Sequence, residues 1–476
     1  MRSGPKGRLI PDIVTRIPTS ANGDIASDNR TITYHLRGDV FWQDGIRLTA
    51  RDVAYTFRQI MNPRNDTGAR IPYVDVASAR ALDDRTLVVT LKRVDAAFVS
   101  KFFAGSFCWG ILPAHVLQAY ASLNDVPFNA MPTVSGPFVV ASWNRGDRLV
   151  LEPNPRYFGG EPHIRIIDRF MPTPGTTVTA LRTGEVDADF HADPAEAHAL
   201  AADARYRIHR TALPAAGTLV FNVSDPVLHD PSLRRALGIA IDTALGARRI
   251  SPGLFLAGDP ESAAFAWAYD ARVKRPHFDR VRAGRELDAL GWVAGNDGVR
   301  SRSGQSLSLS LTVASDGVDP SVAVMLQDQL RHAGVDVAIK SYTPSTLYGL
   351  DGPLRTGRFQ LAYLPQFFID FDGDLSSLLN CDRFPPRGFN FGRYCNARVD
   401  EANRDALGLL NPQRRRAFYR VVQEQLLSDP PWLTLWRMNK VDIVPARLRG
   451  FVATPRYDPY YAVQTWRLPV TEKARF

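Results

Sequence analysis

Alternating apolar and polar residues mark two short segments near the N-terminus of the chain. Residues 31–36 and 86–91 alternate as half-buried β-strands do. Between them, apolar residues recur at helical spacing after Thr49, a good N-cap residue, with Asp52 three positions later as a capping-box partner. The pattern therefore predicts a mixed unit of strands and helices over residues 31–134.

A second unit is predicted where the composition turns to Pro, Gly and Ser over residues 132–138. Residues 139–143 and 148–151 follow as two strands joined by a tight turn. A helix with an apolar face is predicted over residues 174–183. It ends at Gly184, because glycine readily takes the left-handed conformation of a helix C-cap.

Three later helices begin at a polar residue followed by proline: Asp230, Asp319 and Asn411. Each polar residue is expected to be an N-cap, with the proline in the first turn. The helix that starts at Asp319 passes directly into an alternating strand over residues 335–339. This helix-to-strand connection predicts an α/β lobe over residues 245–440.

Composition places the chain among ordinary globular proteins. It has 476 residues, of which 45% are hydrophobic and 22% charged, which suggests two or three packed units. The formal net charge is +9, but the densest basic run is only residues 414–416. Nucleic-acid binders concentrate such charge on one face, so a solvated basic surface is the expected interpretation, and we expect no nucleic-acid partner.

Membrane and export signals are not predicted. No apolar stretch reaches the ~18 residues of a membrane-spanning helix. The first seven residues do not lead into the apolar core of a secretory signal, so we expect no signal peptide in the given chain.

The three cysteines leave two interpretations open. Cys381 and Cys395 bracket a loop rich in Pro, Gly and Asn, which could bring them together in a disulfide or leave two free thiols. Cys108 lies among apolar residues and is interpreted as a small buried hydrophobic side chain.

Common catalytic signatures do not occur in the sequence. It has no Gly-rich phosphate loop, nucleophile-elbow serine or His-Glu-x-x-His helix, so we predict no enzyme activity, cofactor or metal site.

The most suggestive acidic cluster is Asp370-Phe371-Asp372-Gly373-Asp374. It fails as a calcium loop, because the glycine comes too early and the twelfth position is a cysteine. Asp370 follows an apolar run and could lie at a strand end, where it would attract a ligand cation. Asp372 and Asp374 fit equally well as helix-cap or turn carboxylates.

One long segment resembles a known family. Residues 42–57 read WQDGIRLTARDVAYTF and closely resemble the signature of the peptide-type solute-binding proteins of ABC transporters, which bind oligopeptides, dipeptides or nickel. In physical terms the segment is a turn at Asp44 and a capped helix, so its role is expected to be structural. Further matching segments follow in the family's order at residues 111–115, 135–138, 143–147, 154–160, 181–187, 221–222, 234–237 and 240–242.

The resemblance implies an α/β, two-lobed periplasmic-binding-protein-like fold with an extra subdomain, closing around a ligand by hinge bending. Its expected parts are an N-terminal lobe from residues 1–30, 135–244 and 441–476, an inserted subdomain at 31–134 and a C-terminal ligand-binding lobe at 245–440. Family members usually have a longer segment before the equivalent of Leu9, so we expect the N-terminal lobe to be incomplete.

The resemblance also implies a binding site. Asp370 aligns with the carboxylate that holds the peptide's α-ammonium. Gln366, Phe367 and Phe368 would offer extended backbone to the peptide, as in strand addition. Phe221 and Asn222 are further candidates for the cleft wall. Cys381 and Cys395 lie where dipeptide-type relatives have a disulfide.

By this resemblance the chain is expected to be the periplasmic or extracytoplasmic substrate-binding component of an ABC importer. It would be a monomer that captures short peptides and delivers them to permease subunits. Another solute remains open as the ligand: an oligosaccharide, an opine-like compound or a nickel chelate. A glycosidase-like enzyme that uses two acids of residues 370–374 is a further alternative.

Overall fold

The structure is a computed structural model of the whole chain. It describes residues 1–5, 7–104, 110–171, 173–250, 253, 255–256, 262, 265–368, 372–455 and 459–469. Cys108 and Asp370 therefore lie outside the described residues.

The chain divides into two compact units. Unit 1 comprises residues 1–211 and 440–476, and unit 2 comprises residues 212–439. The chain passes between them within two long strands, β10 (Tyr206–Phe221) and β18 (Trp432–Pro445). Residues 212–244, which we expected in the N-terminal lobe, belong instead to unit 2, because β10 continues into the sheet of that unit.

The signature segment forms a turn and a capped helix in unit 1. Helix α1 (Ala50–Met61) begins after Thr49, whose backbone N–H donates to the Asp52 carboxylate at 2.8 Å. The other oxygen of that carboxylate accepts the backbone N–H of Ala114 at 2.9 Å. The Asp52 carboxylate thus links two parts of the chain 62 positions apart, which agrees with the expected structural role of the segment.

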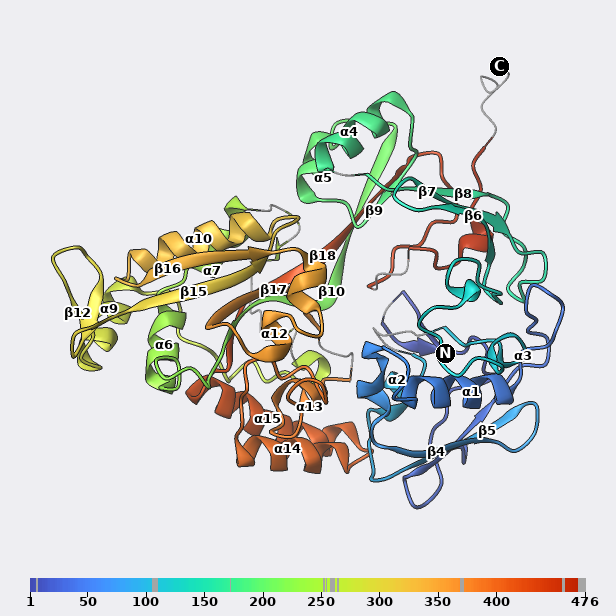
Figure 1. Cartoon of the computed structure of the whole chain (residues 1–476), viewed down its shortest axis with the longest axis horizontal. Coiled ribbons are helices and arrows are strands. Elements are labelled where there is room, and N and C mark those ends of the chain that lie inside the picture. Colours follow the sequence, from blue (N-terminus) through green and yellow to red (C-terminus); the bar gives the residue numbers. More distant parts are fainter. Residues whose placement is uncertain are drawn as a thin grey trace. The chain divides into compact units, whose positions relative to one another are not determined.

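Helix α1 packs against a three-stranded antiparallel sheet. The sheet has the order β3 (Thr31–His35), β5 (Thr86–Leu91), β4 (Val76–Ala81), and the bounds of β3 and β5 agree closely with the predicted strands (Figure 1). Residues of β3 and β5 are alternately buried, as the alternation predicts.

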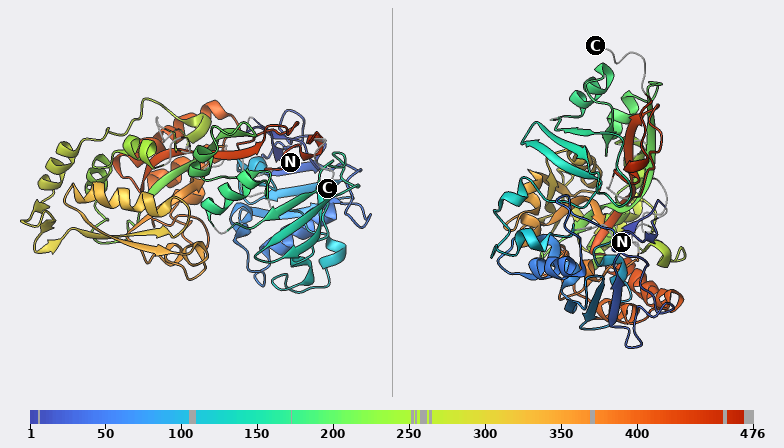
Figure 2. Two further views of the ribbon diagram at one scale, coloured as in Figure 1. Left: turned by 90° about the horizontal axis from the view of Figure 1, so that it is seen from above. Right: turned by 90° about the vertical axis from the view of Figure 1, so that its right-hand side faces the viewer.

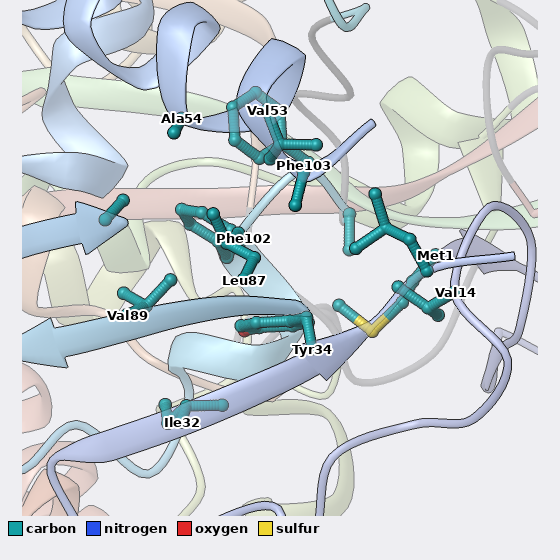
Figure 3. Packing of buried hydrophobic residues seen from close by; sticks show 14 of the residues in the cluster. Met1, Val14, Ile32, Tyr34, Val53, Ala54, Leu87, Val89, Phe102 and Phe103 are labelled. Carbon is teal, nitrogen blue, oxygen red and sulfur yellow. The ribbon is translucent and has the colours of Figure 1, made fainter. Parts of the chain in front are cut away.

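The N-terminal segment shares the core of this sheet. Met1 and Val14 are buried in the same cluster as residues of β3, β5 and α1. Figure 3 shows them beside Tyr34 of β3. Residues 1–30, which we assigned to another part of the protein than residues 31–134, therefore pack with that subdomain. The physical reason is that one face of a small sheet needs more apolar cover than α1 supplies.

A second antiparallel sheet of unit 1 contains β6 (Phe138–Asn144), β7 (Arg148–Pro153) and β8 (Ile166–Arg169). Phe138 packs with Val444, Leu448 and Trp466 in a core that joins this sheet to the C-terminal segment. Nearby, α4 (Pro174–Thr183) ends at Gly184 with φ +79°, as predicted.

Unit 2 is built on a mixed sheet with the strand order β11-β18-β10-β17-β15-β16. Strand β15 (Ser308–Ala314) pairs in parallel with both β16 (Asp336–Tyr342) and β17 (Leu361–Phe368). Parallel neighbours need a crossover, and α10 (Asp319–Arg331) provides it between β15 and β16. Strands β15 and β16 and helix α10 lie side by side in the views of Figures 1 and 2.

The remaining elements are shorter or cover these sheets. Those of unit 1 are β1 (Arg2–Ser3), β2 (Leu9–Ile10), η1 (Gly68–Tyr73), α2 (Phe98–Lys101), α3 (Ala114–Leu117), η2 (Pro127–Asn129), β9 (Asp189–Phe190), α5 (Pro194–Ala199) and η4 (Val463–Thr465). Those of unit 2 are α6 (Pro231–Ile239), α7 (Thr243–Arg249), β11 (Phe255–Leu256), η3 (Ala266–Ala268), α9 (Arg280–Ala289), β12 (Val293–Ala294), β13 (Arg300–Arg302), β14 (Gln305–Ser306), α11 (Pro344–Tyr348), α12 (Pro353–Thr356), α13 (Ser376–Leu379), α14 (Ala397–Leu407) and α15 (Pro412–Ser428).

Charged side chains are buried in unit 1 where β18 enters it. Lys440 and Asp442 are almost fully buried and pair at 3.1 Å. Asp189 of β9 lies opposite Ile443 of β18. Burial and the nearby carboxylates, Glu196 foremost, raise the pKa of Asp189 to about 8. Asp189 therefore holds a proton at neutral pH.

This raised pKa makes stability depend on pH. Between pH 3.8 and about 8, Asp189 keeps its proton in the folded protein but loses it in the unfolded chain. The folded state therefore becomes less stable relative to the unfolded state as the pH rises toward 8. The Asn side chain of Asp189→Asn is neutral at every pH. We therefore expect the melting temperature of this variant to exceed that of the wild type by a margin that grows as pH rises from 5 to 8. Thermal melts across this range check it.

Asp187→Asn is the matched control, because the Asp187 side chain is 67% exposed. It should leave the pH dependence of melting as in the wild type. An Asp189→Asn curve parallel to that of the wild type would contradict the assignment.

Candidate functional site

The carboxyl ends of three parallel strands meet at one edge of the unit 2 sheet. Ala314, the last residue of β15, pairs with Tyr342, the last residue of β16. The register of β15 with β17 pairs Thr312 with Ala362, which brings Ala314 level with Leu364. In α/β sheets, ligands bind outside the carboxyl ends of the strands, so this edge is the candidate site.

Strand β17 extends beyond its parallel neighbour. Among the described residues, its ladder to β15 ends at Ala362, whereas on its other side Phe367 and Phe368 still pair with Ala216 and Ala215 of β10. Residues 365–368 consequently extend past the end of β15 and leave one backbone edge without a β15 partner.

The predicted peptide-binding residues lie on this extension. Gln366, Phe367 and Phe368 are in β17, where the structure describes their backbone but not their side chains. Asp370 falls two residues after the strand, outside the described residues. Its role as a ligand contact stays a prediction.

The next acid after Asp370 is engaged in a buried ion pair. The Asp372 carboxylate accepts two hydrogen bonds from the guanidinium of Arg415, at 3.1 and 2.6 Å. Arg415 is only 2% exposed and also donates to the hydroxyl of Tyr419 at 2.7 Å. The backbone carbonyl of Asp372 accepts the indole N–H of Trp267 at 2.9 Å. Asp372 therefore anchors the chain just after the predicted ligand carboxylate.

Asp374 is a turn carboxylate. It is buried and accepts the backbone N–H of Ser376, the first residue of α13, at 2.9 Å. Of the two interpretations open for Asp372 and Asp374, the structure therefore favours the structural one. A glycosidase pair would need both carboxylates free to face a substrate.

Phe221 and Asn222 lie at the end of β10. Phe221 is 1% exposed. The Asn222 amide donates to the backbone carbonyls of Gly357 and Phe359, at 2.9 and 2.8 Å, and its oxygen accepts the hydroxyl of Ser224. These contacts hold the turn that precedes β17. A ligand contact from either residue stays a prediction.

Cys381 and Cys395 form a disulfide, with an S–S distance of 2.11 Å. The bridge closes the loop between α13 and α14. The Asp400 carboxylate of α14 accepts the backbone N–H of Cys381 at 3.1 Å, and the Asn390 side chain bonds inside the loop to the carbonyl of Tyr394 at 2.7 Å. The loop is therefore held by side chains as well as by the bridge.

A second acidic group follows β15 at the same edge. Asp319 was expected to cap α10, but the N-cap is Val318, and Asp319 is the first helical residue. Its side chain is 4% exposed. Burial, and then the charge of Asp316, raise the pKa of Asp319 to about 7. Sequence reasoning missed this group because Asp before Pro is the usual signal of a cap.

The described residues contain no group of three His, Cys, Asp or Glu side chains placed to hold a metal ion. None of their helices is long and apolar enough to cross a membrane.

The sequence matches the family of bacterial extracellular solute-binding proteins, family 5 Middle, over residues 9–382. It is 30% identical to Protein XP55 of Streptomyces lividans over 444 residues, which cover 90% of this chain and 76% of that protein. It is 25% identical to the oligopeptide-binding protein AppA of Bacillus subtilis, over 90% of this chain and 80% of AppA.

Solved structures show the same fold. AppA of Bacillus subtilis in complex with a nonapeptide superposes with a TM-score of 0.85 at 21% identity, over 98% of this chain and 92% of AppA. NikZ of Campylobacter jejuni in complex with Ni(L-His) gives 0.84 at 22% identity, over the same shares of the two chains. The predicted two-lobed α/β periplasmic-binding-protein fold is confirmed.

The Asp372–Arg415 pair predicts a stability effect. Asp372→Asn should destabilise unit 2 by about 3 kcal/mol, because it leaves the buried guanidinium without its charge partner. Urea unfolding of the purified protein measures the change.

Asp382→Asn serves as the control, since the Asp382 side chain is 61% exposed beside Arg383. It should change stability by less than about 0.5 kcal/mol. An Asp372→Asn variant as stable as this control would show that the ion pair does not hold the segment.

Proposed function

Because the chain belongs to the bacterial extracellular solute-binding proteins, family 5, we propose that it captures short peptides as a monomer and delivers them to the permease of an ABC importer. Members of this family are substrate-binding components of ABC transporters for peptides and related solutes, and they act outside the cytoplasm. The observation that carries the proposal is the family match over residues 9–382, which runs through the candidate edge of unit 2.

A peptide as the ligand is supported by the backbone of β17. Residues 365–368 extend past β15, and among the described residues this edge has no β15 partner. Apart from the missing N–H of Pro365, it can form main-chain hydrogen bonds with an extended peptide. Such bonds are the same for every peptide sequence, which suits a protein that takes up mixed peptides. AppA of Bacillus subtilis, named an oligopeptide-binding protein, aligns over most of this chain.

The α-ammonium of the peptide needs an opposite charge. An ammonium group taken out of water loses several kcal/mol of hydration, which a fixed carboxylate and its hydrogen bonds largely restore. Asp370 is our candidate for this carboxylate. Its neighbours support the choice, because Asp372 and Asp374 already bind Arg415 and the start of α13.

The proposed contacts can account for micromolar binding. Micromolar affinity corresponds to about 8 kcal/mol. One charge-assisted pair, several main-chain hydrogen bonds and apolar contacts can supply this after the entropy lost on binding.

A ligand screen tests the proposal. We expect di-, tri- or pentapeptides to raise the melting temperature of the purified protein, because a ligand at 100 times its Kd stabilises the folded state by about 2.7 kcal/mol. Oligosaccharides and Ni²⁺ with L-histidine are the comparison ligands. Stabilisation by one of these alone, with no response to any peptide, would assign a different solute.

Neutralising Asp370 tests the site. Asp370→Asn should weaken binding of the peptide found in the screen by at least about tenfold, which corresponds to 1.4 kcal/mol, because its ammonium then faces an uncharged amide. Titration calorimetry measures the Kd. The control Asp382→Asn, at an exposed position of the same unit, should keep the affinity of the wild type. Equal affinity in all three proteins would remove Asp370 from the site.

A further inference from the structure

The segment that leads into α9 is strongly basic. Residues 274–285 contain five lysine or arginine residues and a single acid, Asp279, which gives a net charge of +4, with histidine neutral, out of +9 for the whole chain. The Asp279 carboxylate caps α9, where it accepts the backbone N–H of Arg282 at 2.8 Å. No ion pair joins Asp279 to a cation among the described residues, so the positive charge of this segment is left largely uncompensated.

Three of the five cations have no partner on the protein. They are exposed, and no hydrogen bond or ion pair joins their side chains to any described residue: Lys274, Arg280 and Arg285. The other two are engaged. Arg282 pairs with Glu286 at 2.8 Å, and Arg275 donates to the backbone carbonyl of Thr434 at 3.0 Å. The first three are therefore available to an anion outside the protein.

Two apolar side chains lie exposed among these cations. Phe278 is 41% exposed and Val281 is 72% exposed. Helix α9 buries Ala283 and Leu287. Because a helix turns about 100° per residue, Val281 and Arg285 lie on its opposite face, one turn apart. The outward face of α9 thus combines an exposed apolar side chain with an unpaired cation.

The body of unit 2 holds this segment in place. The backbone N–H of Asp279 donates to the carbonyl of Ile239, the last residue of α6, at 3.1 Å. Helix α9 packs against α6 and lies beside β12 (Figure 1). The exposed cations and apolar side chains of this segment are called the α9 patch, and they are Lys274, Phe278, Arg280, Val281 and Arg285.

We propose that the α9 patch docks unit 2 on a membrane surface that contains anionic lipids. Lysine and arginine side chains bind the phosphate groups of such lipids, and aromatic or aliphatic side chains between them enter the headgroup region. The exposed and unpaired cations of the patch are complementary in charge to this surface, and its two apolar side chains lie among them.

Other classes of partner fit the patch less well. A stable protein interface buries about 800 Å² on each partner around a well-packed core, and two exposed apolar side chains provide little of such a core. Nucleic acid would contact the cations through its phosphates but would leave Val281 in water. A lipid surface uses both kinds of side chain and requires no matching shape.

Docking would hold the protein near the membrane in which a permease lies. The family to which the chain belongs consists of extracellular solute-binding proteins. Each cation close to an anionic surface strengthens binding about fivefold, so three of them give a weak and reversible attachment. The inference is independent of which solute the protein captures.

Vesicle sedimentation tests the docking. The full chain is mixed with vesicles of phosphatidylcholine that contain about one third phosphatidylglycerol, and with vesicles of phosphatidylcholine alone. We expect binding to the anionic vesicles only. Binding should weaken as salt is added, because ions screen exposed charges beyond about 10 Å at 0.1 M. Equal binding to both kinds of vesicle, or binding to neither, overturns the inference.

Removal of charge locates the contact. The triple variant Lys274→Gln, Arg280→Gln, Arg285→Gln should lower the vesicle partition coefficient about a hundredfold. The control removes the same charge from three exposed arginines of unit 2 whose side chains also have no described partner: Arg387→Gln, Arg398→Gln and Arg414→Gln. It should bind within about threefold of the wild type, because these positions do not face the lipid. An equal loss in both variants would assign the attraction to net charge and overturn the patch.

The apolar side chains distinguish insertion from charge attraction alone. Phe278→Ser with Val281→Ser should lower the partition coefficient about tenfold. Val324→Ser is the control, since Val324 of α10 is 57% exposed and lies outside the patch. A melting curve for each variant confirms that it is folded, and Val281→Ser alone, expected to lose about threefold, replaces the double variant if that one does not fold. Unchanged binding in the folded apolar variant overturns insertion of the patch.

Two further measurements separate the possible partners and functions. Short duplex DNA that binds more tightly than the anionic vesicles, and is lost in the triple variant, would assign the patch to nucleic acid and overturn the docking. Titration calorimetry of the triple variant should give the peptide affinity of the wild type. Peptide binding without vesicle binding therefore overturns only the docking, and vesicle binding without peptide binding overturns only the proposed ligand.

Discussion

The parallel pairing of β15 with β16 and β17 is the constraint on which the candidate site depends. Parallel strands place their carboxyl ends at one edge, and the residues that follow each strand meet there whatever their distance in sequence. Asp319 comes after β15 and Asp370 comes after β17, fifty-one positions apart in the chain. With an antiparallel β15, the segments after these two strands would leave opposite ends of the sheet.

Buried charges in this protein differ in whether they have partners. Lys440 pairs with Asp442, and Arg415 pairs with Asp372. Arg234 likewise pairs with Asp429, at the start of the turn before β18. The Arg415 and Arg234 pairs each link two segments, whereas Lys440 and Asp442 lie on the same strand, and removing one partner of any pair would leave an uncompensated charge. Asp319 is the contrast, since its environment supplies burial and a like charge but no cation among the described residues.

The signature segment, residues 42–57, has a structural role. Asp52 binds the start of its own helix with one oxygen and the backbone of Ala114 with the other, and the Thr56 hydroxyl accepts the N–H of Leu112. These bonds fix a connection within unit 1, whereas the candidate edge belongs to unit 2. A motif of this kind therefore identifies the family without identifying the ligand.

Local features were determined by the sequence alone. The bounds of β5, the capped start of α1 and the left-handed end of α4 at Gly184 all depend on residues within a few positions of one another, so alternation and capping patterns predict them. The family resemblance added the fold and the disulfide pairing of Cys381 with Cys395, which spacing by itself left open. Only the tertiary structure decided that residues 212–244 belong to unit 2, that Asp372 meets Arg415 forty-three positions away, and that Asp319 is buried without a cap to make. The reason is physical: pairing and burial depend on the path of the whole chain, whereas a helix start depends on one turn.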